Sequence, residues 1–265
     1  MIAFAAIAPH GEVAMEDSDG SPTRDGMDEL GRRFAAAAPE VAIVFTPHNA
    51  HVEGAFAVVT AARIEGTLAA LDRPDLTLDC PIDRELALGV RDAIRAEGVP
   101  VVGVSFGGNM VEQSAMPIDW GVFVPLWFMG GRGEPQTPVV VVSPARDRPI
   151  EEHVRVGAAV GRAAGSRRVA VIASCDHGHA HSADGPYGFD PAAAEFDERV
   201  VELVGANRLE ALVDFDPDFV ARASADSWWQ MVMLHGALGG DFEAELLSYE
   251  VKRYYGMLSA AYAAK

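Results

Sequence analysis

Short apolar runs alternate along the chain with longer segments in which apolar and charged residues follow the spacing of an amphipathic helix. Apolar, β-branched-rich runs predict buried strands over residues 2–8, 41–46, 56–60, 99–105, 139–143 and 169–174. Helical spacing predicts a helix that begins after residue 82 or 83 and runs to about 97, and further helices over 150–164 and 192–204. Strands that are apolar throughout, with no alternation of polar residues, must be covered by other elements on both faces of their sheet. We therefore predict an α/β fold, a single domain over residues 1–265 with a central, largely parallel or mixed sheet covered by helices on both faces.

Two stretches interrupt this alternation. Residues 11–27 are rich in Gly, Asp and Ser, and residues 181–191 are rich in Gly, Pro and Asp. Loops of this length and composition are either active-site loops or plain surface connections. The pattern alone leaves both interpretations open.

Charge and composition exclude several classes of partner. The 265 residues carry a formal net charge of -18, and no run of Lys or Arg forms a basic stripe, so nucleic acid and anionic membrane surfaces would be repelled. The apolar stretch 2–8 is too short to span a membrane and lacks signal-peptide features, so we expect a cytoplasmic protein. Cys80 and Cys175 are expected to be reduced thiols. Base rates for enzymes favour a homodimer.

Histidines carry most of the chemical information. His10 and His48 each follow a predicted strand, and a third group, His177, His179 and His181, follows the strand at 169–174. Because ligands bind beyond the carboxyl ends of strands in open α/β sheets, these groups should converge. Such a cluster can hold a metal with two imidazoles and use a third as acid or base. His51 lies near the second group without an assigned role, and His153 and His235 fall in helical segments and are expected to be structural.

Other motifs exclude some enzyme classes. No Gly-x-Ser-x-Gly elbow supports a serine hydrolase. The glycine-rich segment 106–109 lacks the end of a phosphate-binding loop and is expected to be a tight turn. The Met and Trp residues of segment 226–234 are expected to pack in the core.

Several short motifs, taken in order, resemble one family. They cover nearly the whole chain and are found at residues 8–10 (Ala-Pro-His), 46–48 (Thr-Pro-His), 118–126, 176–179, 186–190, 195–197 and 235–238. Together they resemble the catalytic (B) subunit of the class III extradiol ring-cleavage dioxygenases, the LigB-like superfamily. The resemblance implies a non-haem Fe(II) site that cleaves a catecholic or aminophenolic ring with O2. It implies that His10 and His48 are metal ligands and that His179 is the acid–base catalyst. Small separate subunits are known in the family.

Two residues are candidates for the third metal ligand. The resemblance points to Asp226, shortly before a helix that ends near residues 236–238, although an Asp at this place is also a good helix N-cap. Glu250, at the end of a predicted strand, is the alternative. Where the family usually has Asp-His-Gly, this chain has Trp120, which would favour a flat, less anionic substrate or would simply be buried in the core. His177 and His181 are either substrate contacts or solvated loop residues.

Two other functions use the same residues. The ligand set could hold Zn(II) and activate water, as in a zinc-dependent hydrolase. A non-enzymatic metal-binding or interaction protein on the same fold is the third possibility, because fold alone does not decide function.

Overall fold

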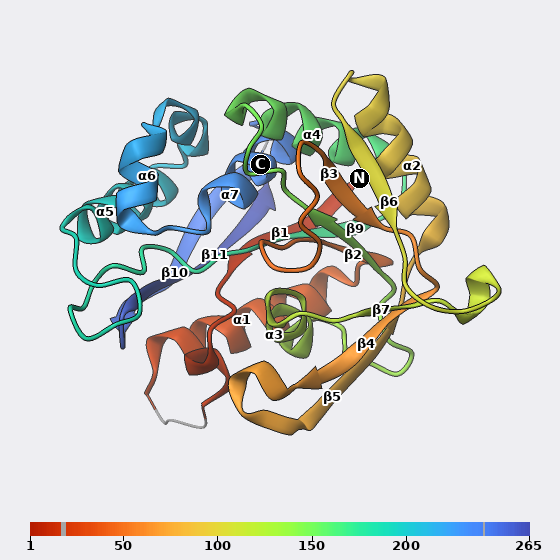
Figure 1. The fold of residues 1–265 in the computed structure, drawn as a ribbon, viewed down its shortest axis with the longest axis horizontal. Helices are drawn as coiled ribbons and strands as arrows, with labels where there is room; N and C mark the ends of the chain where they lie inside the picture. The colour runs from red at the N-terminus through yellow and green to blue at the C-terminus, as the bar shows by residue number, and fades with distance from the viewer. Residues whose placement is uncertain (17–19, 241) are drawn as a thin grey trace.

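The computed structural model describes residues 1–16, 20–240 and 242–265. Within them, eight strands form one sheet in the order β10-β11-β1-β9-β2-β8-β3-β6 (Figure 1). Their bounds are β1 Ile2–Ala8, β2 Val41–Phe45, β3 Phe56–Val59, β6 Val101–Val104, β8 Val139–Ser143, β9 Val169–Ser174, β10 Phe242–Lys252 and β11 Tyr255–Ala264.

Four parallel strands form the centre of this sheet. β1 pairs with β9, β9 with β2, and β2 with β8, all in parallel, whereas β11 and β3 add to the two sides in antiparallel orientation. Every residue of β2, β8 and β9 is buried, which explains why these segments are apolar without alternation.

Helices cover both faces of the sheet, as Figure 1 shows. α1 (Pro22–Ala37) and α3 (Trp120–Phe128) lie on one face, and α2 (Arg84–Ala96), α4 (Ile150–Ala163) and α7 (Trp228–Leu238) lie on the other. α5 (Ala192–Gly205) and α6 (Pro217–Ala223) pack against each other, and α5 also contacts β10. The predicted α/β fold, with a mixed sheet between helical layers, is confirmed. No helix among the described residues is long and apolar enough to cross a membrane.

Two glycines allow α4 and α7 to cross closely. A Cβ atom at Gly157 would lie 1.9 Å from the carbonyl oxygen of Met233, and one at Gly236 would lie 2.1 Å from that of Val154. Both contacts involve backbone, which cannot move aside as a flexible side chain can. The crossing therefore sets the position of α7 and of the residues just before it, which include Asp226.

Most predicted boundaries agree with the structure to within two residues. α2 begins after Asp83, whose side chain accepts a hydrogen bond from the Leu86 backbone N–H.

The predicted loop over 11–27 is too long. A 3-10 helix, η1 (Glu12–Met15), lies inside it, and α1 begins at Pro22 after Ser21, a start signal that the analysis of composition overlooked. Residues 17–19 of that prediction lie outside the described residues.

A second, three-stranded sheet was not predicted. β4 (Arg63–Leu68) pairs with β5 (Arg73–Pro81) in antiparallel orientation and with β7 (Ala115–Pro117) in parallel. β4 and β5 are largely exposed and rich in charged residues, so they lack the apolar runs that indicate buried strands. Three further short 3-10 helices connect elements: η2 Ala69–Leu71, η3 Val111–Gln113 and η4 Leu209–Asp214.

Candidate metal centre and pocket

The candidate site lies at the carboxyl ends of the four central parallel strands. His10 follows β1 by two residues, His48 follows β2 by three, and Asp176 follows β9 by two. Because β1, β9 and β2 are neighbours in the sheet, these side chains reach the same place. Asp226 follows no strand of the sheet and lies two residues before α7, a helix that packs on β9.

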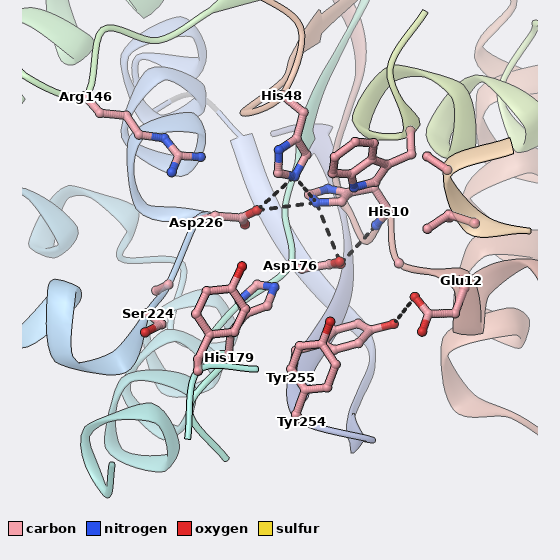
Figure 2. Close-up of a pocket in the computed structure, with 16 residues that line it drawn as sticks. His10, Glu12, His48, Arg146, Asp176, His179, Ser224, Asp226, Tyr254 and Tyr255 are labelled. Atoms are coloured by element: carbon pink, nitrogen blue, oxygen red, sulfur yellow. Dashed lines mark hydrogen bonds and ion pairs between the residues drawn. The ribbon is translucent and has the colours of Figure 1, made fainter. Parts of the chain in front are cut away.

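His10, His48 and Asp226 bring one ligand atom each to a common point (Figure 2). Their ligand atoms all lie within 4.8 Å of one another. Asp226 Oδ2 is 3.5 Å from His10 Nε2 and 3.2 Å from His48 Nε2, and the two Nε2 atoms are 3.1 Å apart. Two imidazoles and one carboxylate in this arrangement form a possible metal site.

A hydrogen bond at Nδ1 of His10 leaves its Nε2 atom facing the cluster. The Ser174 hydroxyl donates to the Gly121 carbonyl oxygen, so it accepts from His10 Nδ1–H at 2.9 Å. Nδ1 therefore carries the proton of the neutral ring, and the Nε2 lone pair faces Asp226. Asp176 accepts from the His10 backbone N–H at 3.0 Å, and its other oxygen lies 3.5 Å from Nε2.

Electrostatics favour a positive charge at this point. Burial alone would lower the pKa of His10, but the carboxylates of Asp176 and Asp226 outweigh it and raise this pKa to about 9. Burial alone would raise the pKa of Asp226, but His10 and His48 hold it well below its usual range. The buried carboxylates that stabilise a proton on His10 would also stabilise a divalent cation at the same place. Two imidazoles and a carboxylate are suitable ligands for such a cation.

The Asp226 carboxylate does not cap α7. Ser227 occupies the N-cap position of α7, and no side chain caps the helix there. Asp226 is 8% exposed, and its Oδ1 atom is buried without a hydrogen-bond partner among the described residues. An unpaired buried carboxylate oxygen is costly, and a bound cation would satisfy it. The structure therefore does not support the alternative interpretation of Asp226 as the N-cap of α7.

Glu250, the alternative third ligand, lies elsewhere. It belongs to β10, and its carboxylate accepts hydrogen bonds from the Ser21 hydroxyl at 3.0 Å and the Thr23 backbone N–H at 2.9 Å. These donors stand at the start of α1, so the carboxylate stabilises that end of the helix. Glu250 is therefore absent from the cluster at the strand ends.

Trp120 lies beside His48. Their rings are stacked, with centroids 4.3 Å apart and an angle of 30° between the planes. Trp120 is half-buried and lines the pocket as the first residue of α3, whose N-cap Asp119 accepts from the Val122 backbone N–H. Asp119 also accepts from the Thr46 hydroxyl at 2.9 Å, which ties the start of α3 to the end of β2.

Long-range hydrogen bonds hold the backbone at His179 and two residues before it. The His177 N–H donates to Gly256 at the start of β11, and the His179 N–H donates to the Ala223 carbonyl oxygen. His179 Nδ1 lies 2.8 Å from the His177 carbonyl oxygen, which can only accept. Nδ1 therefore carries a proton, and Nε2 is the atom of the neutral ring that can accept another.

His177 and His181, predicted as either substrate contacts or solvated loop residues, are not among the residues that line the pocket. His177 is fully buried, with Nδ1 at 3.0 Å from the Ser227 hydroxyl. His181 Nε2 lies 2.9 Å from the buried carboxylate of Asp197. Asp197 also accepts from the Gly178 backbone N–H at 2.8 Å and the Tyr249 hydroxyl at 2.9 Å, so it anchors the loop that carries His179.

A pocket of about 410 Å³ opens over the cluster, and Figure 2 shows its main lining residues. His179 stacks on Tyr255 with ring centroids 5.5 Å apart, and Tyr187 meets the His179 ring edge-on at 5.4 Å. Both irregular stretches noted in the sequence reach this pocket, the first through Glu12 and the second through Tyr187. They contribute to the site as well as connecting elements.

Several lining residues were missed by the sequence analysis: Glu12, Arg146, Asp176, Tyr187, Tyr254 and Tyr255. Asp176 and Arg146 could have been found, because each follows a predicted strand by two or three residues, as the histidines do. Tyr254 and Tyr255 lie at the turn between β10 and β11, and no local pattern links that turn to the histidines.

The remaining expectations concern residues outside the pocket. Cys80 and Cys175 are free and buried, and Cys175 lies 3.8 Å from the Ser227 carbonyl oxygen. His153 is buried in α4 and His235 is half-buried in α7, as structural histidines should be. His51 is exposed. Segment 106–109 is a turn with Gly107 and Gly108 at positive φ, and Trp228, Met231 and Met233 are core residues.

Comparison with known proteins identifies the family. Residues 6–264 match the model for the catalytic LigB subunit of aromatic ring-opening dioxygenase, so the chain belongs to this family. The predicted resemblance is confirmed, and the family carries a dioxygenase-type fold.

One curated protein and one solved structure are similar to this chain, and neither name states an activity. The chain is 26% identical over 231 residues to Protein CA_C1420 of Clostridium acetobutylicum, a match that covers 86% of this chain and 49% of that protein. The chain therefore spans about half the length of this curated relative. A crystal structure of the uncharacterized protein JW3007 from Escherichia coli K12 has a similar fold, with a TM-score of 0.65 and 16% identity, over 97% of this chain and 98% of the other.

Proposed function

We propose, from membership of the family of catalytic LigB subunits, that this protein is a non-haem Fe(II)-dependent extradiol dioxygenase acting on a catecholic or aminophenolic ring with O2. The observation that carries the proposal is the convergence of His10, His48 and Asp226 on one point beneath an aromatic-lined pocket. A facial set of two histidines and one carboxylate with open positions is typical of non-haem iron oxygenases.

His10, His48 and Asp226 would hold the metal. Iron, when bound, would supply the redox coupling between a closed-shell aromatic and triplet O2, a reaction that is slow without a metal. The chain's contribution is to fix the ligands. Ser174 and Asp176 hold the His10 ring and backbone, and such supporting partners orient ligands and tune their basicity.

His179 is the group for proton transfer in this proposal. Its Nδ1–H is held by the His177 carbonyl oxygen, so Nε2 would accept a proton from a substrate hydroxyl. Stacking on Tyr255 and the backbone bond to Ala223 fix the ring plane. The tyrosines around it and Trp120 offer flat apolar faces against which an aromatic ring can pack.

One experiment separates this proposal from its alternatives. The purified protein is reconstituted with Fe(II) or Zn(II) without oxygen, its metal content is measured, and oxygen consumption is then followed on a panel of catechols and aminophenols. Iron retention with oxygen uptake and a ring-opened product supports the dioxygenase. Zinc retention with ester or amide hydrolysis and no oxygen uptake would instead indicate a zinc-dependent hydrolase. Metal binding without either activity would indicate a non-enzymatic protein.

A further inference from the structure

One peptide group connects the His179 ring to a buried carboxylate. His179 Nδ1 lies 2.8 Å from the His177 carbonyl oxygen. The Gly178 N–H donates to Asp197 Oδ1, also at 2.8 Å. That carbonyl and that N–H belong to the same trans peptide, in which they point in opposite directions, so the imidazole and the carboxylate bind its two sides. Figure 2 shows His179 at the pocket next to Tyr255.

The Asp197 carboxylate is fully buried in α5 and makes several hydrogen bonds. Its side chain is 0% exposed. Oδ2 accepts from the Tyr249 hydroxyl at 2.9 Å and lies 2.9 Å from His181 Nε2. A Cβ atom at Gly256 would lie 1.8 Å from Oδ2, so a glycine is needed where the start of β11 approaches this oxygen. Because the interior screens charge weakly, the negative charge acts strongly on the groups bonded to it.

The peptide between His177 and Gly178 is also held by contacts that do not involve Asp197. The His177 N–H donates to the Gly256 carbonyl oxygen at 2.8 Å, and the Gly256 N–H donates to the Gly178 carbonyl oxygen at 3.0 Å. These two backbone hydrogen bonds lie on either side of the peptide and fix its orientation. The charge of Asp197 can therefore be removed while the peptide stays in place.

A carboxylate bound to the N–H of a peptide makes the carbonyl of that peptide a better acceptor. Hydrogen bonds in a chain polarise one another, by about 10–30% per bond. The charge on Asp197 thus strengthens the bond between the His177 carbonyl oxygen and the proton on His179 Nδ1. Only the tautomer with its proton on Nδ1 leaves Nε2 with a lone pair, so only this tautomer can accept a proton at Nε2.

We propose that Asp197 is a positioning residue for His179: through the His177–Gly178 peptide, its charge holds the imidazole in the Nδ1–H tautomer. The arrangement places a peptide between the carboxylate and the histidine, where other enzymes use a direct carboxylate–histidine hydrogen bond. The proposal rests on the proposed function only for the reaction in which Nε2 takes a proton. The tautomer itself is a property of the folded chain and can be measured without turnover.

The first test measures the tautomer of His179 by 15N NMR. The full chain is labelled with 15N-histidine and studied with and without added Zn(II), at a pH where imidazoles are neutral. Protonated and unprotonated ring nitrogens differ widely in 15N chemical shift, and the signals missing in His179→Gln identify those of His179. The wild type should show almost only the Nδ1–H form. A wild-type ring that is mainly the Nε2–H form overturns the proposal without any further variant.

The second test removes the charge of the carboxylate. Asp197→Asn keeps the shape of the side chain and an oxygen that can accept from the Gly178 N–H, and it should convert the single tautomer into a mixture. Tyr249→Phe is the matched control, because it removes a hydrogen bond from Oδ2 of the same carboxylate but leaves the charge and the Gly178 contact. It should keep the Nδ1–H form.

Equal changes of tautomer in Asp197→Asn and Tyr249→Phe would mean that the loop has only loosened, and no change in Asp197→Asn would mean that the charge has no effect. Either result overturns the proposal. Thermal unfolding shows whether both variants are folded. If Asp197→Asn does not fold, Asp197→Ser, a second uncharged replacement with an oxygen acceptor, is measured against the same two expectations.

Oxygen uptake by the Fe(II)-reconstituted protein reports separately on the proposed function. Asp197→Asn should lower kcat roughly 10- to 100-fold, as for other supporting partners of site histidines, with KM and iron content unchanged, and Tyr249→Phe should have little effect. A change of tautomer in Asp197→Asn, in a protein that takes up no oxygen on any catechol or aminophenol, supports the role of Asp197 and refutes the dioxygenase. Oxygen uptake with tautomer and kcat unchanged in Asp197→Asn refutes the role of Asp197 and leaves the dioxygenase standing.

Discussion

Replacing Asp226 by Asn tests the candidate metal centre most directly. The change keeps the shape of the side chain and removes its charge. Asp226 Oδ2 lies 3.2 Å from His48 Nε2 and 3.5 Å from His10 Nε2, and Oδ1 has no partner. If these atoms surround a metal ion, the variant loses the one negative charge that faces the ion from this side, and the metal should be lost.

The expected magnitude follows from binding linkage. A metal present at about 1,000 times its dissociation constant stabilises the folded protein by about 4 kcal/mol. Changes in groups that only support ligands weaken binding roughly 10- to 100-fold, and losing a ligand should cost more. A 100-fold loss would remove about 2.7 kcal/mol of that stabilisation. For a chain of this size, this lowers the metal-induced rise in Tm by roughly 5–10 °C.

The assay combines metal analysis with thermal unfolding, with and without added Fe(II) under anaerobic conditions. The difference between the two Tm values isolates metal binding from any effect of the substitution on the metal-free protein. His10→Ala and His48→Ala should behave like Asp226→Asn. Glu250→Gln is the matched control, because its carboxylate bonds to Ser21 and Thr23 away from the cluster. It should keep both the metal and the metal-induced rise.

Two results would refute this reasoning. Full iron content in Asp226→Asn, with an unchanged rise in Tm, would mean that Asp226 is no ligand. Loss of iron in Glu250→Gln would instead assign the role to Glu250, a β10 residue whose carboxylate accepts hydrogen bonds at the start of α1. A small loss of about 1 kcal/mol in stability with iron retained would be typical of a lost helix cap, and the geometry of Ser227 and Asp226 argues against it.

Three further predictions concern other parts of the molecule. His179→Gln should keep iron but lower kcat about 100- to 10,000-fold, because the residue is assigned to proton transfer; loss of iron would make it a ligand instead. Trp120→His should shift substrate preference toward more anionic rings, measured as kcat/KM ratios, whereas lower stability with unchanged ratios would indicate a core role only. Burial lowers the pKa of His153 to about 4, so the unfolded state binds this proton more tightly. The free energy of unfolding should therefore fall as the pH drops from about 6.5 to 4, by at most about 3 kcal/mol from this residue. His153→Gln should reduce that fall in chemical denaturation at pH 7.5 and 5.0, and an identical pH dependence would exclude the effect.

The sequence predicted the centre of the fold better than its periphery. β1, β2, β8 and β9 are buried on both faces, so they had to be apolar throughout and were recognisable. β4 and β5 are exposed strands whose stability comes from pairing with each other, and nothing in their composition separates them from loops. The start of α1 was not predicted, because the Gly- and Asp-rich residues around it are typical of a loop. Ser21 at the N-cap and Pro22 at the first helical position are nevertheless a known start signal.

In the candidate site, too, some residues could be predicted from the sequence and others could not. Residues that follow central strands, such as His10, His48 and His179, could be found because strand ends meet at one edge of a sheet. Asp226 came only from the family resemblance, since its own context suits a helix cap equally well. What brings it to the cluster is the close crossing of α4 and α7 at Gly157 and Gly236, which depends on contacts between helices far apart in sequence.

The position of a residue just after a strand predicts that it lies at the edge of the sheet where the site is. It does not predict which other residues lie next to it, because that depends on the order of the strands in the sheet. Along the chain the four central strands appear as β1, β2, β8 and β9, whereas in the sheet β9 lies between β1 and β2, and β8 lies outside them. This order inserts Asp176 between the two histidine-bearing strands and puts Arg146 beside His48. A histidine pattern identifies strand ends, but only the strand order shows which charges stand next to the histidines. The charged groups that line the pocket therefore include residues, such as Arg146, that no histidine motif identifies.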